Sequence, residues 1–297
     1  MTIIEAALEK TKALRGLRPE AGQTGGAAHG LSGSATPQAR RAPAPNLPPP
    51  STQIQAARVA FDPHAARENR LLLTATVPED RGTVAAYGML RTRILHRMRA
   101  KGWETLGVTS AAPQDGKSLT AVNLALSLAR EKNSAVILLD LDMRNPTVCR
   151  TLGITPQLEL RDFFEGRVDT PDDLFMSIGV DNLLIAGSLT ATQNSAELLA
   201  STRLEELLAF IRRSTTSPLI LIDLPPVLSP DDTLVVAPRI DALILVASEG
   251  VTPREDLQKA SEMLADFPVA GLVLNRSTDG SQRYGYGYGY GGGNNSG

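Results

Sequence analysis

The sequence has little cysteine, few aromatic residues and no long hydrophobic run. Cys149 is the single cysteine in 297 residues, so no intrachain disulfide can form and a reducing compartment is expected. Aromatic side chains make up 4% of the chain, so a core must be built from aliphatic residues. Hydrophobic residues make up 42%, which is enough for such a core.

The chain also lacks the features of membrane insertion and of nucleic-acid binding. No apolar run approaches the roughly 20 residues that span a bilayer, and no hydrophobic signal-peptide stretch is found at the N-terminus. The formal net charge of -2 argues against a dedicated nucleic-acid binder. We therefore expect a cytoplasmic protein that reaches a membrane only through a partner.

The N-terminal part divides into two segments. Residues 1–15 have the apolar spacing of a short amphipathic helix, which is either a marginal capping helix or a docking element for a membrane protein or another subunit. Residues 16–74 are rich in proline, glycine and alanine without a repeating period, which predicts a disordered linker.

The C-terminal segment 279–297 holds four of the five tyrosines of the chain. Tyr284, Tyr286, Tyr288 and Tyr290 alternate with glycine. Glycine loses the most entropy on ordering and no aliphatic residue is present to offset it, so we expect a disordered tail with exposed hydroxyl groups. Such a tail is either a substrate or a low-complexity segment that self-associates weakly.

Apolar strands alternate with helices between residues 75 and 278. This alternation predicts one α/β domain with a doubly wound, mostly parallel sheet. The expected strands are 105–110, 135–142, 181–187, 218–226, 241–250 and 269–275, and the expected helices are 83–100, 117–130, 195–214 and 253–266.

A phosphate-binding loop is predicted where the first of these strands meets the following helix. Gly116, Lys117 and Ser118 stand at that turn, where backbone N–H groups and the helix N-terminus can cradle phosphates. Lys117 would reach the β- and γ-phosphates and Ser118 would bind Mg²⁺. Ala111 replaces the first glycine of the usual P-loop pattern. The alternative is an ordinary helix start with a surface lysine.

Three aspartates follow two other apolar strands. Asp140 and Asp142 end the strand 135–142, and Asp223 lies at the end of an apolar run before two prolines. Ligands of such sheets bind at the carboxyl ends of the strands. Each aspartate alone is readily a cap or turn residue. Together, beside a triphosphate, they would repel one another without a cation, so their clustering predicts a metal.

These segments resemble those of a known enzyme family. The matching stretches are AAPQDGKS at 111–118, LLDLDMRNP at 138–146 and LIDLPPVLSPDD at 221–232, followed by a tyrosine-rich tail. They are similar to the Walker A, A′ and B motifs of the bacterial tyrosine kinases of capsule and exopolysaccharide synthesis. The resemblance covers about residues 83–290 and implies a P-loop NTPase-like fold.

The resemblance also implies roles for individual residues. Lys117, Asp140 and Asp142 would be catalytic, with Asp140 accepting the tyrosine proton or orienting its hydroxyl. Ser118, Asp142 and Asp223 would hold Mg²⁺. ATP would contact Ala111, Pro113, Asp115, Gly116, Lys117, Ser118, Leu119 and Asn275. The four tail tyrosines would be autophosphorylated between subunits of a homo-oligomer, and a membrane adaptor or polysaccharide co-polymerase would be a separate partner.

The sequence departs from the family pattern before the P-loop. The family often carries Glu-x-x-Arg-x-x-Arg there, and the corresponding residues are Ala85, Gly88 and Arg91. Two other functions stay open. The first is a non-kinase ATPase of the partition or cell-division type, although its signature lysine would stand at Ala112. The second is a scaffold with a degenerate nucleotide site.

Overall fold

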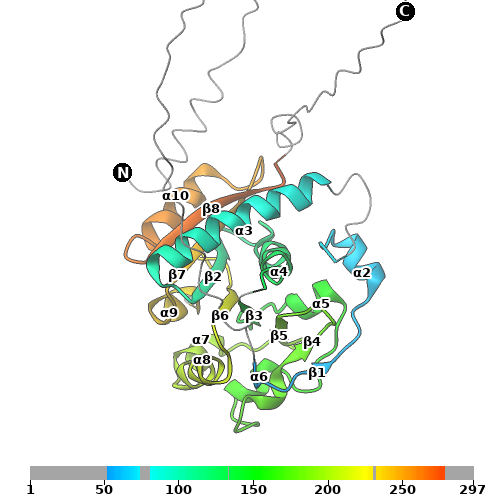
Figure 1. The fold of residues 1–297 in the computed structure, drawn as a ribbon. Helices are drawn as coiled ribbons and strands as arrows, with labels where there is room; N and C mark the ends of the chain where they lie inside the picture. Colours follow the sequence, from blue (N-terminus) through cyan, green and yellow to red (C-terminus); the bar gives the residue numbers. More distant parts are fainter. Residues whose placement is uncertain (1–51, 74–80, 133, 230–231, 278–297) are drawn as a thin grey trace, which may run out of the picture.

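The computed structural model describes residues 52–73, 81–132, 134–229 and 232–277 (Figure 1). The helix predicted at 1–15, residues 16–51 of the predicted linker and the tail 279–297 lie outside the described residues.

One mixed, mostly parallel sheet forms the centre of the described chain. Its eight strands follow the order β1-β4-β5-β3-β6-β2-β7-β8, and all neighbouring pairs are parallel except β4 with β5. The strands are β1 (Ala57–Arg58), β2 (Thr105–Ser110), β3 (Ala135–Asp140), β4 (Met176–Ser177), β5 (Leu183–Ala186), β6 (Pro218–Asp223), β7 (Ala242–Ser248) and β8 (Val269–Asn275). The predicted fold class is confirmed.

Helices cover both faces of the sheet (Figure 1). The α-helices are α2 (Pro63–Glu68), α3 (Arg81–Lys101), α4 (Lys117–Leu128), α5 (Val148–Leu152), α6 (Leu160–Phe164), α7 (Ser195–Ala200), α8 (Arg203–Ser214), α9 (Asp232–Val236) and α10 (Arg254–Met263). Two short 3-10 helices, η2 (Asp172–Leu174) and η3 (Ala237–Arg239), complete the set. No helix among these described elements has the length and apolar content needed to cross a bilayer.

Two hydrophobic clusters hold these layers together. Helices α2 to α5 contribute to one cluster, and α6 to α10 contribute to the other. Strand β3 serves both, because Val136 and Leu138 face the first cluster while Ile137 and Leu139 face the second. Covering both faces explains why the central strands are continuous apolar runs without alternation.

The predicted linker boundary at residue 74 is wrong for residues 52–73, which pack on the domain. Strand β1 pairs with β4 at the edge of the sheet, and helix α2 lies against α5. Ile54 and Leu71 are buried, with 7% and 1% of their surfaces exposed. A two-residue strand and a six-residue helix carry too short a pattern to be recognised beside a proline-rich segment.

The helix predicted at 195–214 is two helices. Backbone at Ser201 is extended, with a ψ of 168°, and it separates α7 from α8. The Ser201 hydroxyl donates to the carbonyl oxygen of Leu198. Serine side chains that bond to nearby backbone compete with helical hydrogen bonds, which accounts for the break. Helix α3, by contrast, continues through Gly88.

Candidate nucleotide-binding and catalytic site

The loop between β2 and α4 has the backbone shape of a phosphate cradle. Gln114 and Gly116 both adopt left-handed conformations, with φ of 66° and 89°. A Cβ atom at Gly116 would lie 2.0 Å from Nδ2 of the Asn275 side chain, and the φ of 89° disfavours any residue with a Cβ, so glycine suits this position. Helix α4 starts at Lys117, so its N-terminal N–H groups meet this loop.

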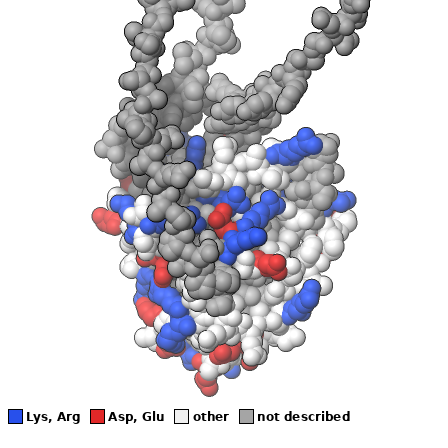
Figure 2. All heavy atoms as spheres, in the orientation of Figure 1, with Lys and Arg blue, Asp and Glu red and all other residues white. Residues whose placement is uncertain are grey.

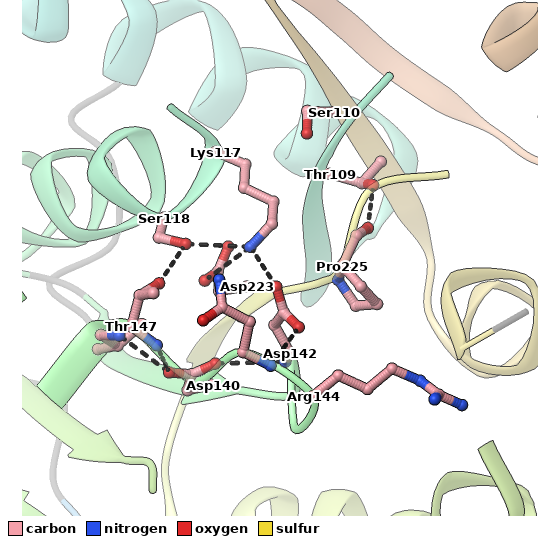
Figure 3. Close-up of polar contacts among 12 residues, drawn as sticks. Thr109, Ser110, Lys117, Ser118, Asp140, Asp142, Arg144, Thr147, Asp223 and Pro225 are labelled. Carbon is pink, nitrogen blue, oxygen red and sulfur yellow. Dashed lines mark hydrogen bonds and ion pairs between the residues drawn. The ribbon is translucent and has the colours of Figure 1, made fainter. Parts of the chain in front are cut away.

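The Lys117 side chain lies between two carboxylates (Figure 3). Its Nζ is 2.7 Å from Oδ2 of Asp142 and 3.5 Å from Oδ2 of Asp223. The same ammonium group donates to the Ser118 hydroxyl at 3.1 Å. Burial acts to lower the pKa of Lys117, but the charges of Asp223 and Asp142 outweigh it and raise the pKa above its usual value. Lys117 is therefore charged although it is buried.

Asp223 is a fully buried carboxylate whose Oδ2 forms an ion pair with Lys117 at 3.5 Å, and neither of its oxygens accepts a closer hydrogen bond within the described residues. Burial raises its pKa from 3.8 to about 6, although the charge of Lys117 opposes this rise. Buried polar atoms are normally satisfied, so this carboxylate is suited to a further ligand.

Asp140 organises the segment that follows β3. Its Oδ2 accepts the backbone N–H groups of Thr147 and Val148 at 3.0 and 2.9 Å, and its Oδ1 accepts that of Asp142 at 3.2 Å. Burial and the charge of Asp223 raise the pKa of Asp140 well above its usual value. Asp140 thus holds the start of α5, and Thr147 in turn donates its hydroxyl to Ser118 at 2.7 Å.

The other predicted nucleotide-binding residues lie in the loop or beside it. Ala111 and Pro113 belong to the loop, and Leu119 lies in the first turn of α4. Asn275 ends β8 and donates its side-chain amide to the carbonyl oxygen of Asp115 at 2.9 Å. The structure therefore brings these predicted residues together at one edge of the sheet, while the four tail tyrosines lie outside the described residues.

Sequence reasoning missed several polar residues around this site. Thr147 is one of them, and a second group surrounds the buried Asp232. Asp232 accepts the Ser195 hydroxyl at 2.5 Å and the Arg144 Nε at 3.2 Å. Figure 3 shows Arg144 pointing away from the Lys117 ammonium group. No local pattern signals this group, because its members come from three distant parts of the chain.

The fit of a magnesium ion depends on oxygen donors. Within the described ranges, no group of three or more His, Cys, Asp or Glu side chains could hold a metal by itself. Ser118, Asp142 and Asp223 nevertheless offer the hard oxygen ligands that Mg²⁺ prefers, and the Asp223 carboxylate has only its ion pair with Lys117. Mg²⁺ usually takes one or two carboxylates together with phosphate oxygens and water, so these residues fit a site completed by a nucleotide.

Comparison with known proteins agrees with this geometry. The ParA family, described as the NUBPL iron-transfer P-loop NTPase, matches residues 104–286. A P-loop NTPase fold implies that the chain binds a nucleotide.

Similar individual proteins indicate the enzyme family more narrowly than the P-loop NTPase match does. The chain is 30% identical over 188 residues to the tyrosine-protein kinase CpsD of Streptococcus pneumoniae, covering 61% of this chain and 80% of CpsD. The chain belongs to the bacterial tyrosine-kinase family. Tyrosine-protein kinase YwqD of Bacillus subtilis is 29% identical over 218 residues, which span 71% of this chain and 87% of YwqD.

A solved structure of this tyrosine-kinase family has the same fold. The kinase domain of VpsO is 28% identical and superposes with a TM-score of 0.59, covering 67% of this chain and 97% of that domain. The expected family, a P-loop protein-tyrosine kinase, is therefore confirmed.

Proposed function

We propose that the chain is an ATP-dependent autokinase that phosphorylates Tyr284, Tyr286, Tyr288 and Tyr290 in its own tail. The observation that carries the proposal is the position of Lys117, charged and buried between Asp142 and Asp223 at the P-loop. Membership of the tyrosine-kinase family supports tyrosine as the phosphate acceptor.

Transfer of a phosphoryl group depends mainly on positioning and on neutralising charge. The loop N–H groups and the N-terminus of α4 would bind the phosphates, and Lys117 would contact the β- and γ-phosphate oxygens. Ser118, Asp142 and Asp223 would hold Mg²⁺. When bound, Mg²⁺ neutralises negative charge on the phosphates.

Asp140 and Asp142 would act on the tyrosine side of the reaction. Asp140 is expected to orient the attacking hydroxyl or accept its proton, and its raised pKa suits a proton acceptor. Its three backbone contacts also keep Asp142 and Thr147 in place. Asp142 faces Lys117 and would help to bind the metal.

The exit of the chain from the domain supports the tail as substrate. Strand β8 ends at Asn275, which touches the P-loop, and Arg276 donates to the Gln114 carbonyl oxygen at 3.0 Å. A random coil of the length from Asn275 to Tyr290 would span about 20 Å, from roughly 5–6 Å multiplied by the square root of the number of residues. The tyrosines would therefore reach the site of a neighbouring subunit, or their own.

The P-loop sequence and the Lys117 site argue against a partition-type ATPase and against a degenerate scaffold. A partition-type ATPase would need its signature lysine at the position of Ala112, and a degenerate scaffold would not preserve the buried Lys117 between two aspartates. On the face shown in Figure 2, basic and acidic side chains of the described residues are interspersed.

We further propose a cytoplasmic kinase that regulates capsule or exopolysaccharide synthesis or export. A membrane adaptor or polysaccharide co-polymerase would recruit it to the membrane, and homo-oligomers would bring tails to neighbouring sites. Ala85 and Gly88 replace residues of the family motif on α3, so the subunit contact would differ from one made by Glu and Arg.

Mass spectrometry tests the kinase function. The purified chain is incubated with Mg²⁺ and ATP, with and without a candidate adaptor fragment, and phosphotyrosine is mapped. Phosphate is expected on the tail tyrosines. A variant with the four tail tyrosines changed to Phe should lose the tail phosphate, which shows where the phosphate is attached. Lys117→Ala should also lose it, which shows that transfer depends on the P-loop. Absence of tail phosphate under both conditions would contradict the proposal.

A further inference from the structure

The P-loop carries an aspartate, Asp115, and each oxygen of its carboxylate accepts a hydrogen bond from the protein. Asp115 has 1% of its surface exposed. Its Oδ2 accepts the backbone N–H of Ala112 at 3.0 Å, and its Oδ1 accepts the Thr252 hydroxyl at 2.5 Å. The side chain of Asp115 is thus used to shape the loop.

Thr252 links this carboxylate to the end of β7. Its hydroxyl oxygen accepts the backbone N–H of Ser248 at 2.7 Å. A carboxylate only accepts hydrogen bonds, so the hydroxyl proton must point to Asp115. The three groups form a directed chain from the Ser248 N–H through the Thr252 hydroxyl to the Asp115 carboxylate.

The loop needs such restraint because its backbone is unusual. Gln114, a non-glycine residue, and Gly116 flank Asp115 in left-handed conformations. Left-handed backbone at a non-glycine residue is disfavoured and persists when its surroundings impose it. Phosphate binding needs the loop N–H groups to be oriented before the ligand arrives. The hydrogen bonds to Asp115 hold the strained backbone in place and keep the loop N–H groups oriented.

We propose that Thr252 is a positioning residue for the nucleotide phosphates and acts through Asp115 on the P-loop. The inference rests on the proposed function in that this loop binds ATP. Thr252 and Asp115 are 137 positions apart, and the contact exists because β7 lies beside β2 in the sheet.

Nucleotide titration tests the proposal. Thr252→Val removes the hydroxyl at nearly constant volume, and Thr252→Ser keeps it. The full chain is titrated with a fluorescent ADP analogue in the presence of Mg²⁺. We expect affinity on the order of tenfold weaker for Thr252→Val, from the loss of one hydrogen bond to a charged group, and near wild-type affinity for Thr252→Ser. The KM for ATP should rise while kcat changes little.

The chain offers a matched control at the other end of β2. The Thr105 hydroxyl donates to Oδ2 of Asp241 at 2.6 Å and accepts the Asp241 N–H at 2.8 Å. Thr105→Val removes the same kind of bond away from the P-loop. It should lower the melting temperature and leave nucleotide affinity unchanged.

Several results would overturn the proposal. Unchanged affinity in folded Thr252→Val would do so, as would equal losses in the Val and Ser variants. If Thr252→Val does not fold, Thr252→Ala, which adds no atoms, is used in its place. If neither variant folds while Thr105→Val does, Thr252 has a role in folding only, and the proposal is wrong. The titration does not depend on tail phosphorylation, so a wild type without phosphotyrosine contradicts the kinase function and not this result.

Discussion

The ammonium nitrogen of Lys117 lies 2.7 Å from Oδ2 of Asp142, and both side chains are almost completely buried. Phosphate oxygens that bind Lys117 must share its charge with this carboxylate. The ion pair between Lys117 and Asp142 therefore contributes both to the stability of the nucleotide-free domain and to the charge available for binding phosphate.

Replacing Lys117 should destabilise the domain as well as remove activity. Lys117→Ala leaves Asp142 and Asp223 buried without their cation, and breaking a buried pair in this way typically costs about 3–5 kcal/mol. The loss should be large at pH 8 and smaller below pH 6, where carboxylates with raised pKa values take up protons. Chemical denaturation at both pH values measures it, with the exposed Lys101→Ala as control. Equal losses at both pH values would contradict this account.

Asp223 should make the folded state less stable as pH rises. Its folded pKa is about 6 and its usual value is 3.8, so the folded state binds more protons than the unfolded state between these values. Its contribution to stability is greatest below about pH 4 and falls as pH rises through 6, by roughly 3 kcal/mol in total. Asp223→Asn should remove this fall. The measurement is the free energy of unfolding at several pH values between 4 and 7.

Asp241→Asn is the control of opposite sign for that experiment. Burial acts to raise the pKa of Asp241, but hydrogen bonds from Thr105 and the Glu104 N–H outweigh burial and lower it. Its stabilising contribution is present above the usual pKa and is lost as pH falls. Relative to wild type, the two substitutions should change the pH dependence of the free energy of unfolding in opposite directions. Changes in the same direction would contradict the assignment.

Gly116→Ala should impair nucleotide binding. The new Cβ would meet the Asn275 amide at 2.0 Å, and the φ of 89° is strained for alanine. We expect at least a tenfold loss of nucleotide affinity, measured by titration. Gly88→Ala is the matched control, because it lies within α3 with no atom within 4 Å of the new methyl group. That control should stabilise the domain by about 1 kcal/mol and bind nucleotide normally.

Residues 52–73 should behave as part of the kinase domain. Leu71→Ala removes a side chain that is 1% exposed and should lower the free energy of unfolding by about 2–5 kcal/mol. Denaturation of the full chain measures it. Val251, which is 55% exposed, supplies the comparison, since Val251→Ala should change stability little. An equally small effect at Leu71 would place residues 52–73 outside the cooperative unit.

Strongly patterned parts of this fold were predictable from the chain alone. Strands β2, β3, β6 and β7 are apolar runs with turn residues at their ends, and the GKS turn between β2 and α4 indicates a phosphate loop. These features depend on neighbours in sequence, so local pattern and chemistry suffice. The edge element β1 and the break between α7 and α8 were missed because short elements and serine–backbone bonds give no periodic signal.

Residue types at the strand ends indicated which side chains meet, but not how each is used. The packing of β2, β3 and β6 side by side places Lys117 between two aspartates and buries Asp223 with Lys117 as its ion-pair partner. It also places Asp140 against the backbone N–H groups that it accepts. The contact between Thr252 and Asp115 likewise depends on β7 pairing with β2. Burial and distance set these pKa values and hydrogen bonds, and both quantities exist only once segments far apart in sequence have packed together.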